Sequence, residues 1–103
     1  MKRIRILAAA RRDLLAGYRF YEQQAEGIGR YFLDALYADI ESLRISAGVH
    51  AICFDRYHRL LSKRFPWSVY YRIEGNEIRI YAVLDSRRHP ELIRSRLTDE
   101  PAS

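Results

Sequence analysis

The sequence predicts an α+β fold in which an N-terminal strand is followed by an αα-hairpin, a three-stranded antiparallel meander and a short C-terminal helix. Three observations lead to this order, β-α-α-β-β-β-α. Apolar and polar residues alternate with a period of two on both sides of Gly75-Asn76, which is typical of half-buried strands. Apolar residues recur at helical spacing in two stretches between residues 8 and 46. Pro90 followed by Glu91 is a helix-start signal.

The first strand and the first helix come at the N-terminus. Residues 2–7 alternate over a short run, so we expect a strand that joins the sheet from a distance in sequence. From Ala8 onward the strong helix formers Ala, Leu and Arg dominate and no proline intervenes. Gly17 lies inside this helix, where we expect it to permit close packing. The expected buried stripe consists of Ala10, Leu14, Tyr18, Tyr21 and Ala25.

Residues 26–29, which include two glycines, are expected to break the first helix, and a second helix follows to about Ser46. The two helices form an αα-hairpin whose apolar faces need the sheet as a partner. Residues 47–58 show no sustained period and are expected to form a loop with short extended pieces. Its two histidines, His50 and His58, are not spaced like a metal site. The stripe of the second helix consists of Phe32, Leu36, Ile40 and Leu43.

A two-residue turn with glycine first suits a type II′ hairpin, and it sets the register of the strands on either side. It places Glu74 opposite Glu77 and, on the reverse face, Arg72 opposite Arg79 and Tyr70 opposite Tyr81. That face favours a charge checkerboard held by diagonal ion pairs, and the alternative is an anion-facing surface that carries stacking rings. The expected core pairs are Ile73 with Ile78, Tyr71 with Ile80, Val69 with Ala82, and Trp67 with Leu84.

The expected core lies between this face of the sheet and the helical hairpin. We expect one domain over residues 1–97, because 103 residues leave room for one core, and a short tail over residues 98–103. The sheet should contribute Trp67, Val69, Tyr71, Ile73, Ile78, Ile80 and Leu84. The helices should contribute Leu14, Tyr18, Phe32, Leu36 and Ile40.

Composition narrows the class of protein. Cys53 is the single cysteine, so no intramolecular disulfide is available, and no Cys/His pair stands at zinc-finger spacing. We therefore expect no metal and no cofactor. No run approaches the roughly 20 apolar residues of a membrane span, and the N-terminus lacks the apolar core of a signal peptide. The expected location is the cytoplasm, with no membrane partner.

The charge is strongly basic, with a net charge of +5 and a predominance of arginine over lysine. Arginine offers a planar fork of donors suited to phosphate and carboxylate. A chain with this excess of arginine fits two kinds of partner, a nucleic acid or an acidic protein. The candidate residues for binding a target or a nucleic acid are Arg59, Lys63, Arg64, Arg72, Arg79, Arg87 and Arg88.

Four stretches carry a resemblance to a known family. They are Ala10-x-x-Asp13-Leu14, residues 27–33, residues 64–74 with their Phe-Pro-x-x-Val-Tyr-Tyr block, and residues 81–90. Together they resemble the RelE/ParE superfamily of type II toxin-antitoxin toxins, and the pattern is closer to the ParE-like branch. The resemblance implies a plasmid-stabilising toxin held inactive by a cognate antitoxin, whose acidic and apolar segment would wrap over the helices and the sheet. RelE-like members cut mRNA on the ribosome, whereas ParE-like members act on DNA gyrase.

The candidate catalytic set is incomplete for a RelE-like nuclease. A metal-free ribonuclease needs proton-transfer groups and cations for the phosphate. Arg64 and Arg87 could supply cations, and His89 could carry the proton. RelE-like nucleases commonly place a Tyr near the C-terminus, but here Pro90 follows His89. We therefore expect a non-enzymatic gyrase binder, with two alternatives: a ribosome-dependent endoribonuclease, or a stand-alone basic binding module with no antitoxin.

Overall fold

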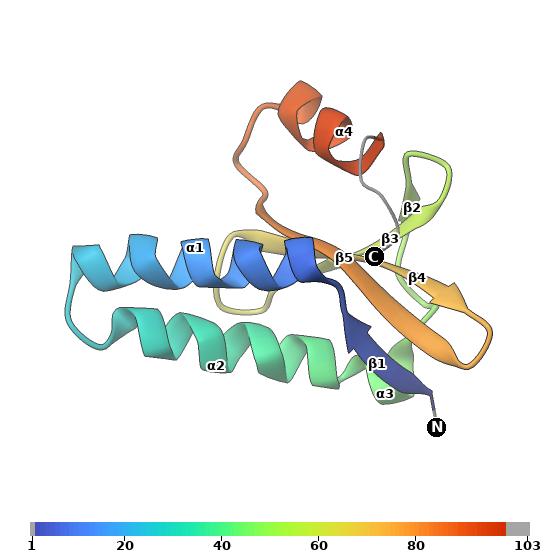
Figure 1. The fold of residues 1–103 in the computed structure, drawn as a ribbon, viewed down its shortest axis with the longest axis horizontal. Helices are drawn as coiled ribbons and strands as arrows, with labels where there is room; N and C mark the ends of the chain where they lie inside the picture. The colour runs from blue at the N-terminus through green and yellow to red at the C-terminus, as the bar shows by residue number, and fades with distance from the viewer. Residues whose placement is uncertain (1, 99–103) are drawn as a thin grey trace.

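A five-stranded sheet carries a helical hairpin on one face and a single helix on the other in the computed structural model, which describes residues 2–98 (Figure 1). The strand order is β1-β5-β4-β3-β2. The predicted α+β class and order of the main elements are confirmed, while the short α3 and β2 are additions to it. The elements are β1 (Arg3–Ile6), α1 (Ala8–Gln24), α2 (Ile28–Glu41), α3 (Leu43–Ser46), β2 (Ile52–Cys53), β3 (Tyr57–Leu61), β4 (Trp67–Glu74), β5 (Glu77–Asp85) and α4 (Pro90–Thr98).

The first strand does join the sheet from a distance in sequence. β1 lies parallel to β5, with Arg3 opposite Glu77 and Ile6 opposite Ile80, and the remaining strands pair antiparallel. Of the tail expected over residues 98–103, Thr98 ends α4 and the rest lies outside the described residues. Within the described part of the chain, no helix has the length and apolar character needed to cross a membrane.

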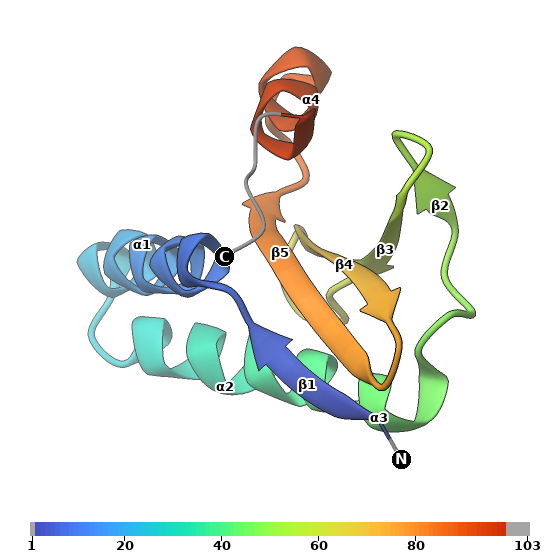
Figure 2. The same cartoon turned by 45° about the vertical axis from the view of Figure 1, so that its right-hand side comes forward.

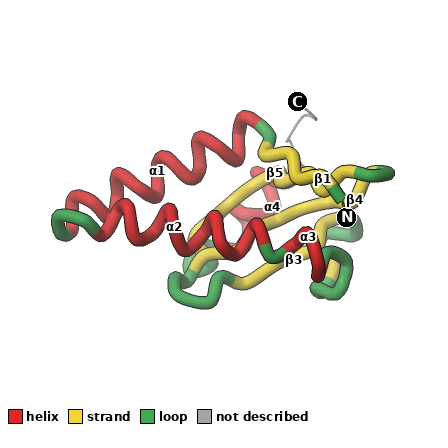
Figure 3. Tube along the Cα trace, turned by 90° about the horizontal axis from the view of Figure 1, so that it is seen from below, coloured by secondary structure: helices red, strands yellow, loops and turns green. Residues whose placement is uncertain are grey.

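The two long helices pack closely at glycines. Figure 3 shows α1 and α2 running side by side and joined by a short turn at the end of the molecule far from β1. A Cβ on Gly17 would lie 2.5 Å from the Phe32 ring, and one on Gly29 would lie 2.7 Å from the Tyr18 carbonyl oxygen. Gly17 therefore permits close packing as predicted, and Gly29 belongs to α2 instead of the break before it. Ala25, predicted to be buried, is exposed because α1 ends before it.

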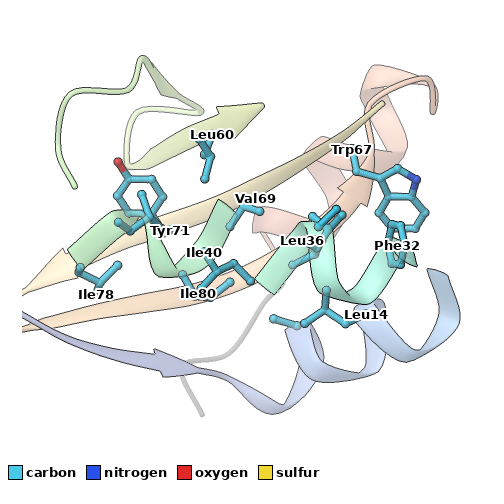
Figure 4. Close-up of a cluster of buried hydrophobic side chains, with 14 residues drawn as sticks. Leu14, Phe32, Leu36, Ile40, Leu60, Trp67, Val69, Tyr71, Ile78 and Ile80 are labelled. Atoms are coloured by element: carbon cyan, nitrogen blue, oxygen red, sulfur yellow. The ribbon is translucent and has the colours of Figure 1, made fainter. Parts of the chain in front are cut away.

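The first apolar cluster fills the space between the helical hairpin and one face of the sheet (Figure 4). Ile73 is only partly buried against it. Tyr18, also expected here, is half-buried and packs where a side chain on Gly29 would stand. The predicted core residues that are confirmed as buried are Leu14, Phe32, Leu36, Ile40, Trp67, Val69, Tyr71, Ile78 and Ile80.

The predicted hairpin register is right beside the turn and wrong beyond it. Gly75 has φ +61° and Asn76 has no positive φ, as a type II′ turn requires. The register shifts between Tyr70 and Tyr71, so that Tyr81 is the extra residue of a β-bulge. A bulge moves every later side chain of its strand to the opposite face. The confirmed pairs are Glu74–Glu77, Arg72–Arg79, Ile73–Ile78 and Tyr71–Ile80, and the corrected ones are Tyr70–Ala82, Val69–Val83, Ser68–Leu84 and Trp67–Asp85.

The bulge creates a second apolar cluster on the reverse face of the sheet. Leu84, which was expected in the first cluster, belongs here, and Ile93 and Leu97 of α4 cover it. Tyr70 and Tyr81 are 2% and 3% exposed, so the alternative of a surface with stacking rings does not hold for this face. The complete set of buried residues in this cluster is Leu7, Tyr57, Tyr70, Tyr81, Ala82, Leu84, Ile93 and Leu97.

The opposed arginines of the hairpin are balanced along their own strands and not diagonally. Arg72 lies 2.9 Å from Glu74, and Arg79 lies 2.7 Å from Glu77. Arg5 of β1 stands next to Arg79 in the neighbouring strand and is 4.0 Å from Glu77. Charge therefore alternates on this part of the reverse face, but the ion pairs that hold it differ from the diagonal ones predicted.

Candidate functional site

A pocket of about 210 Å³ lies between the reverse face of the sheet and the beginning of α4. Arg59 reaches it from β3, and Arg88 reaches it from the connection between β5 and α4. Both were predicted as binding residues. Two guanidinium groups beside apolar walls favour an anion, because charge interactions strengthen where water is excluded. The lining residues are Cys53, Phe54, Arg59, Tyr70, Ser86, Arg88, Pro90 and Ile93.

Hydroxyl groups lie beside the pocket. Nε of Arg59 donates to Oγ of Ser68 at 3.1 Å, and that oxygen lies 2.6 Å from Oγ of Ser86. Ser68 is fully buried, so its hydrogen bond with Nε holds the Arg59 side chain against the sheet. Burial raises the pKa of the Tyr70 hydroxyl and of the Cys53 thiol. Both groups therefore stay protonated at neutral pH and supply no base.

A partly buried ion pair positions α4, which forms one wall of the pocket. Nη1 and Nη2 of Arg96 donate to the two carboxylate oxygens of Asp13, each at 2.7 Å. The same carboxylate accepts the backbone N–H of Val83, two residues after the bulge, at 2.9 Å. The Tyr57 hydroxyl donates to the carbonyl oxygen of Leu97 at 2.9 Å. These contacts join α1, β5, β3 and the last turn of α4, so the wall has a defined position.

His89 has a structural role at the first turn of α4. Its Nδ1 accepts the backbone N–H of Glu91 at 3.1 Å, and its carbonyl oxygen accepts the N–H of Leu92 at 3.0 Å. This is the pattern of a helix N-cap, in which a side chain satisfies an otherwise unpaired donor of the first turn. His89 is exposed and is not among the residues that line the pocket.

The other two catalytic candidates also lie outside this pocket. Arg87 makes a bidentate contact with Asp85, with Nε 2.9 Å from one oxygen and Nη2 2.7 Å from the other. These hydrogen bonds lower the pKa of Asp85 and raise that of Arg87. Arg64 donates from Nη1 to the Tyr31 hydroxyl at 2.9 Å. The structure thus does not gather Arg64, Arg87 and His89 around one pocket.

The remaining predicted binding residues are distributed over two regions. Arg72 and Arg79 lie near the β4–β5 turn in the ion pairs described above, and the Arg72 guanidinium also stands 5.9 Å from the centre of the Tyr81 ring. Lys63 is exposed in the connection between β3 and β4, next to Arg64. Of the seven predicted binding residues, Arg59 and Arg88 are the ones that meet at the pocket.

Sequence reasoning missed the polar residues that support the pocket. Ser68 and Ser86 come together only because the bulge places Ser68 opposite Leu84, near the end of β5. Asp13 belongs to a motif that the sequence singled out, but nothing in the pattern pointed to Arg96. A second cluster was also missed, in which Oη of Tyr71 lies 2.5 Å from Nδ1 of His50 and the His58 ring stacks on Tyr71. Residues 2–98 contain no group of three or more His, Cys, Asp or Glu side chains arranged to hold a metal ion.

The fold and this pocket define a small α+β protein with a basic site under its C-terminal helix. No protein-family model matches the chain, and no curated protein matches its sequence. Among solved structures, the chain is similar to one from the chromosomal ParDE TA system of P. aeruginosa, with 21% sequence identity and a TM-score of 0.76. The match covers 82% of this chain and 96% of that chain. This likeness establishes the fold and confirms the architecture that the resemblance implied.

Proposed function

We propose that the protein is the toxin of a type II toxin-antitoxin module of the ParE-like kind, that a cognate antitoxin neutralises it, and that it acts on DNA gyrase in the cytoplasm. The observation that carries the proposal is the likeness, over most of both chains, to a chain of a ParDE TA system. The ParE-like motifs of the sequence are independent support. A fold hosts several functions, so the target is argued from the site.

The antitoxin is proposed to be acidic in its contact segment and to fold, at least in part, as it binds. Two properties of the surface support this. The net charge is +5, and large apolar side chains stay exposed on the helices. An acidic amphipathic segment would cover both kinds of surface at once. The exposed large apolar residues of α1, α2 and α4 are Leu15, Phe20, Tyr31, Tyr37 and Leu92.

A binding mode of action is supported by how the catalytic candidates are engaged. His89 caps α4, Arg87 is tied to Asp85, and Arg64 is bonded to Tyr31. A general acid-base pair must reach the proton it transfers, and the charges around it must be arranged in advance. Side chains that already serve as cap and ion-pair partners suit a protein that acts through contact.

The second candidate is a ribosome-dependent endoribonuclease, and the pocket at Arg59 and Arg88 is the observation that favours it. Two cations beside Ser86 and Tyr70 resemble a phosphate site more than a protein contact. In that case His89 would still have to act as the base, because burial raises the pKa of Tyr70 and of Cys53 and neither can accept a proton at neutral pH.

The deciding experiment compares His89→Asn with His89→Ala. Asparagine keeps a capping acceptor and removes the imidazole, whereas alanine removes both. Purified protein is added to relaxed plasmid with gyrase and, separately, to a translating ribosome extract. We expect supercoiling to be inhibited, His89→Asn to inhibit like the unchanged protein, and His89→Ala to lose only about 0.5–2 kcal/mol of stability.

Codon-positioned mRNA cleavage that both variants lose by 10²–10⁴-fold, with gyrase unaffected, would instead establish the ribonuclease.

Arg59→Ala and Arg88→Ala should weaken a binding function with a strong dependence on salt, and Arg30→Ala on α2 is the matched control. If expression of the chain does not arrest growth, and the chain binds no acidic protein encoded by a neighbouring reading frame, a stand-alone basic binding module is the remaining function.

A further inference from the structure

The turn between β2 and β3 holds an aromatic residue in an unfavourable backbone conformation. Phe54 and Asp55 have φ +53° and +67°, and the N–H of Arg56 donates to the carbonyl oxygen of Cys53 at 3.4 Å. Two consecutive positive φ values are normally supplied by Asn and Gly. A bulky side chain in the left-handed region is rare, and such residues persist where the surrounding structure or a function requires them.

The strained turn places the Phe54 ring between two pockets. It lines the 210 Å³ pocket at Arg59 and Arg88, and it also lines a second pocket of about 260 Å³ on the side of the last turn of α4. In Figures 1 and 2 the tip of the β2–β3 hairpin rises on the same side of the sheet as α4. Phe54 is half-buried and packs in part against the second apolar cluster, and the Arg94 guanidinium stands 5.2 Å from the centre of its ring. The second pocket is lined by Phe54, Asp55, Arg56, Tyr57, Arg94, Leu97 and Thr98.

Each pocket brings two arginines to the ring. Arg59 and Arg88 line the first pocket, and Arg56 and Arg94 line the second. The acidic groups nearby are Asp55, which also lines the second pocket, and Glu91, whose carboxylate lies 3.9 Å from Nε of Arg94. Cations therefore outnumber carboxylates around the ring, and the surroundings favour a ligand that is both planar and anionic.

We propose that Phe54 is a stacking platform for a nucleotide, with the base on the ring and the phosphate on the arginines of the adjoining pockets. Proteins that bind single nucleic-acid strands combine these two features, an aromatic face for the base and a basic groove for the backbone. Neither pocket alone reaches the ~300 Å³ typical of ligand sites, but both open at the same ring. The ligand chemistry is a phosphorylated base, whether it is a free mononucleotide or part of a strand.

The test is equilibrium binding to the full chain, followed by NMR chemical shifts, with AMP, ribose 5-phosphate and adenosine as ligands. AMP should bind about tenfold or more tightly than ribose 5-phosphate, because only AMP has a base to stack. Phe54→Asn tolerates the left-handed turn and removes the ring, so it should keep the turn and weaken AMP binding roughly tenfold. Phe54→Trp should retain AMP binding, and Arg30→Ala is the control for charge.

Several outcomes decide the proposal. Equal binding of AMP and ribose 5-phosphate, or unchanged AMP affinity in Phe54→Asn, would overturn it, and the first comparison holds even if a variant fails to fold. A hexamer of adenylate that binds more tightly than AMP identifies a strand as the source, and equal affinities identify a free nucleotide. A hexaglutamate peptide that binds as tightly as the adenylate hexamer would also overturn it. Ligand binding is measured without growth arrest or rescue by an antitoxin, so this inference and the proposed function fail independently.

Discussion

At Gly17 the two long helices and the sheet approach closely, since a Cβ there would meet Phe32 at 2.5 Å and Trp67 at 3.0 Å. Gly17→Ala gains about 1 kcal/mol of helix propensity but overpacks the core, which costs about 1–3 kcal/mol. We expect the cost to be near its upper end, because the Phe32 ring is fully buried against Trp67. Urea denaturation should show a net loss of about 1–2 kcal/mol.

The matched control for Gly17→Ala is a second change that makes room. Adding Phe32→Leu removes the ring that the new methyl group would touch, so the double variant should lose less than the two single losses together. Simple additivity of the two changes would mean that the helices separate freely at this point.

His50 should make stability depend on pH. Burial, and secondarily the nearby His58, lowers the pKa of His50 from its ordinary value of 6.5. The unfolded chain then binds the proton more readily, so the free energy of unfolding falls as the pH drops below about 6.5. His50→Gln should remove this part of the pH dependence. Urea denaturation of the unchanged protein and of His50→Gln at about pH 7.5 and about pH 5.5 measures this pH dependence. If the free energy of unfolding falls equally in both proteins, His50 is not the source of the pH dependence.

The C-terminal helix should depend on the ion pair between Asp13 and Arg96. Arg96→Ala removes one partner, whereas Asp13→Ala also leaves the N–H of Val83 without this acceptor. We therefore expect Asp13→Ala to be the more destabilising of the two. A double-mutant cycle should give a coupling of about 0.5–3 kcal/mol, since both side chains are largely shielded from water. The readout is urea denaturation together with hydrogen exchange of the α4 amides, which should be affected first.

The elements themselves were predictable because their patterns are local. Helical stripes, the Gly75-Asn76 turn and Pro90 are each read from a few neighbouring residues. The bulge in β5 could not be predicted, because residues 80–84, Ile-Tyr-Ala-Val-Leu, are apolar at every position and include no glycine to mark a shift in strand register. A strand buried on both faces gives no alternation from which to recover the register.

Across residues 2–98, one sheet carries a separate apolar cluster on each face. Leu36→Ala acts on the helical-hairpin side and Leu84→Ala on the α4 side. Each should cost about 2–5 kcal/mol. Because the sheet lies between them, the double variant should show the sum within about 0.5 kcal/mol. A large deviation in urea denaturation would mean that the two clusters act as one core.

The site was less predictable than the fold for reasons that belong to the whole molecule. Charge predicted Arg59 and Arg88 as binding residues, but the pocket that both of them line depends on where α4 lies. That position follows from contacts such as Asp13 with Arg96, whose partners are far apart in sequence. His89 was chosen for its chemistry, and its capping role became visible only with the helix geometry.

The parallel pairing of β1 with β5 also has a consequence in time. Arg3 finds its neighbour only when Glu77 has been synthesised, and the helical hairpin cannot cover a complete sheet before then. At about 5–20 residues per second, a ribosome needs roughly four to fifteen seconds to make the intervening chain. For that interval the nascent protein exposes the apolar stripes of α1 and α2 with no finished sheet beneath them. A partner already present in the cell can therefore meet this chain before it has a tertiary structure.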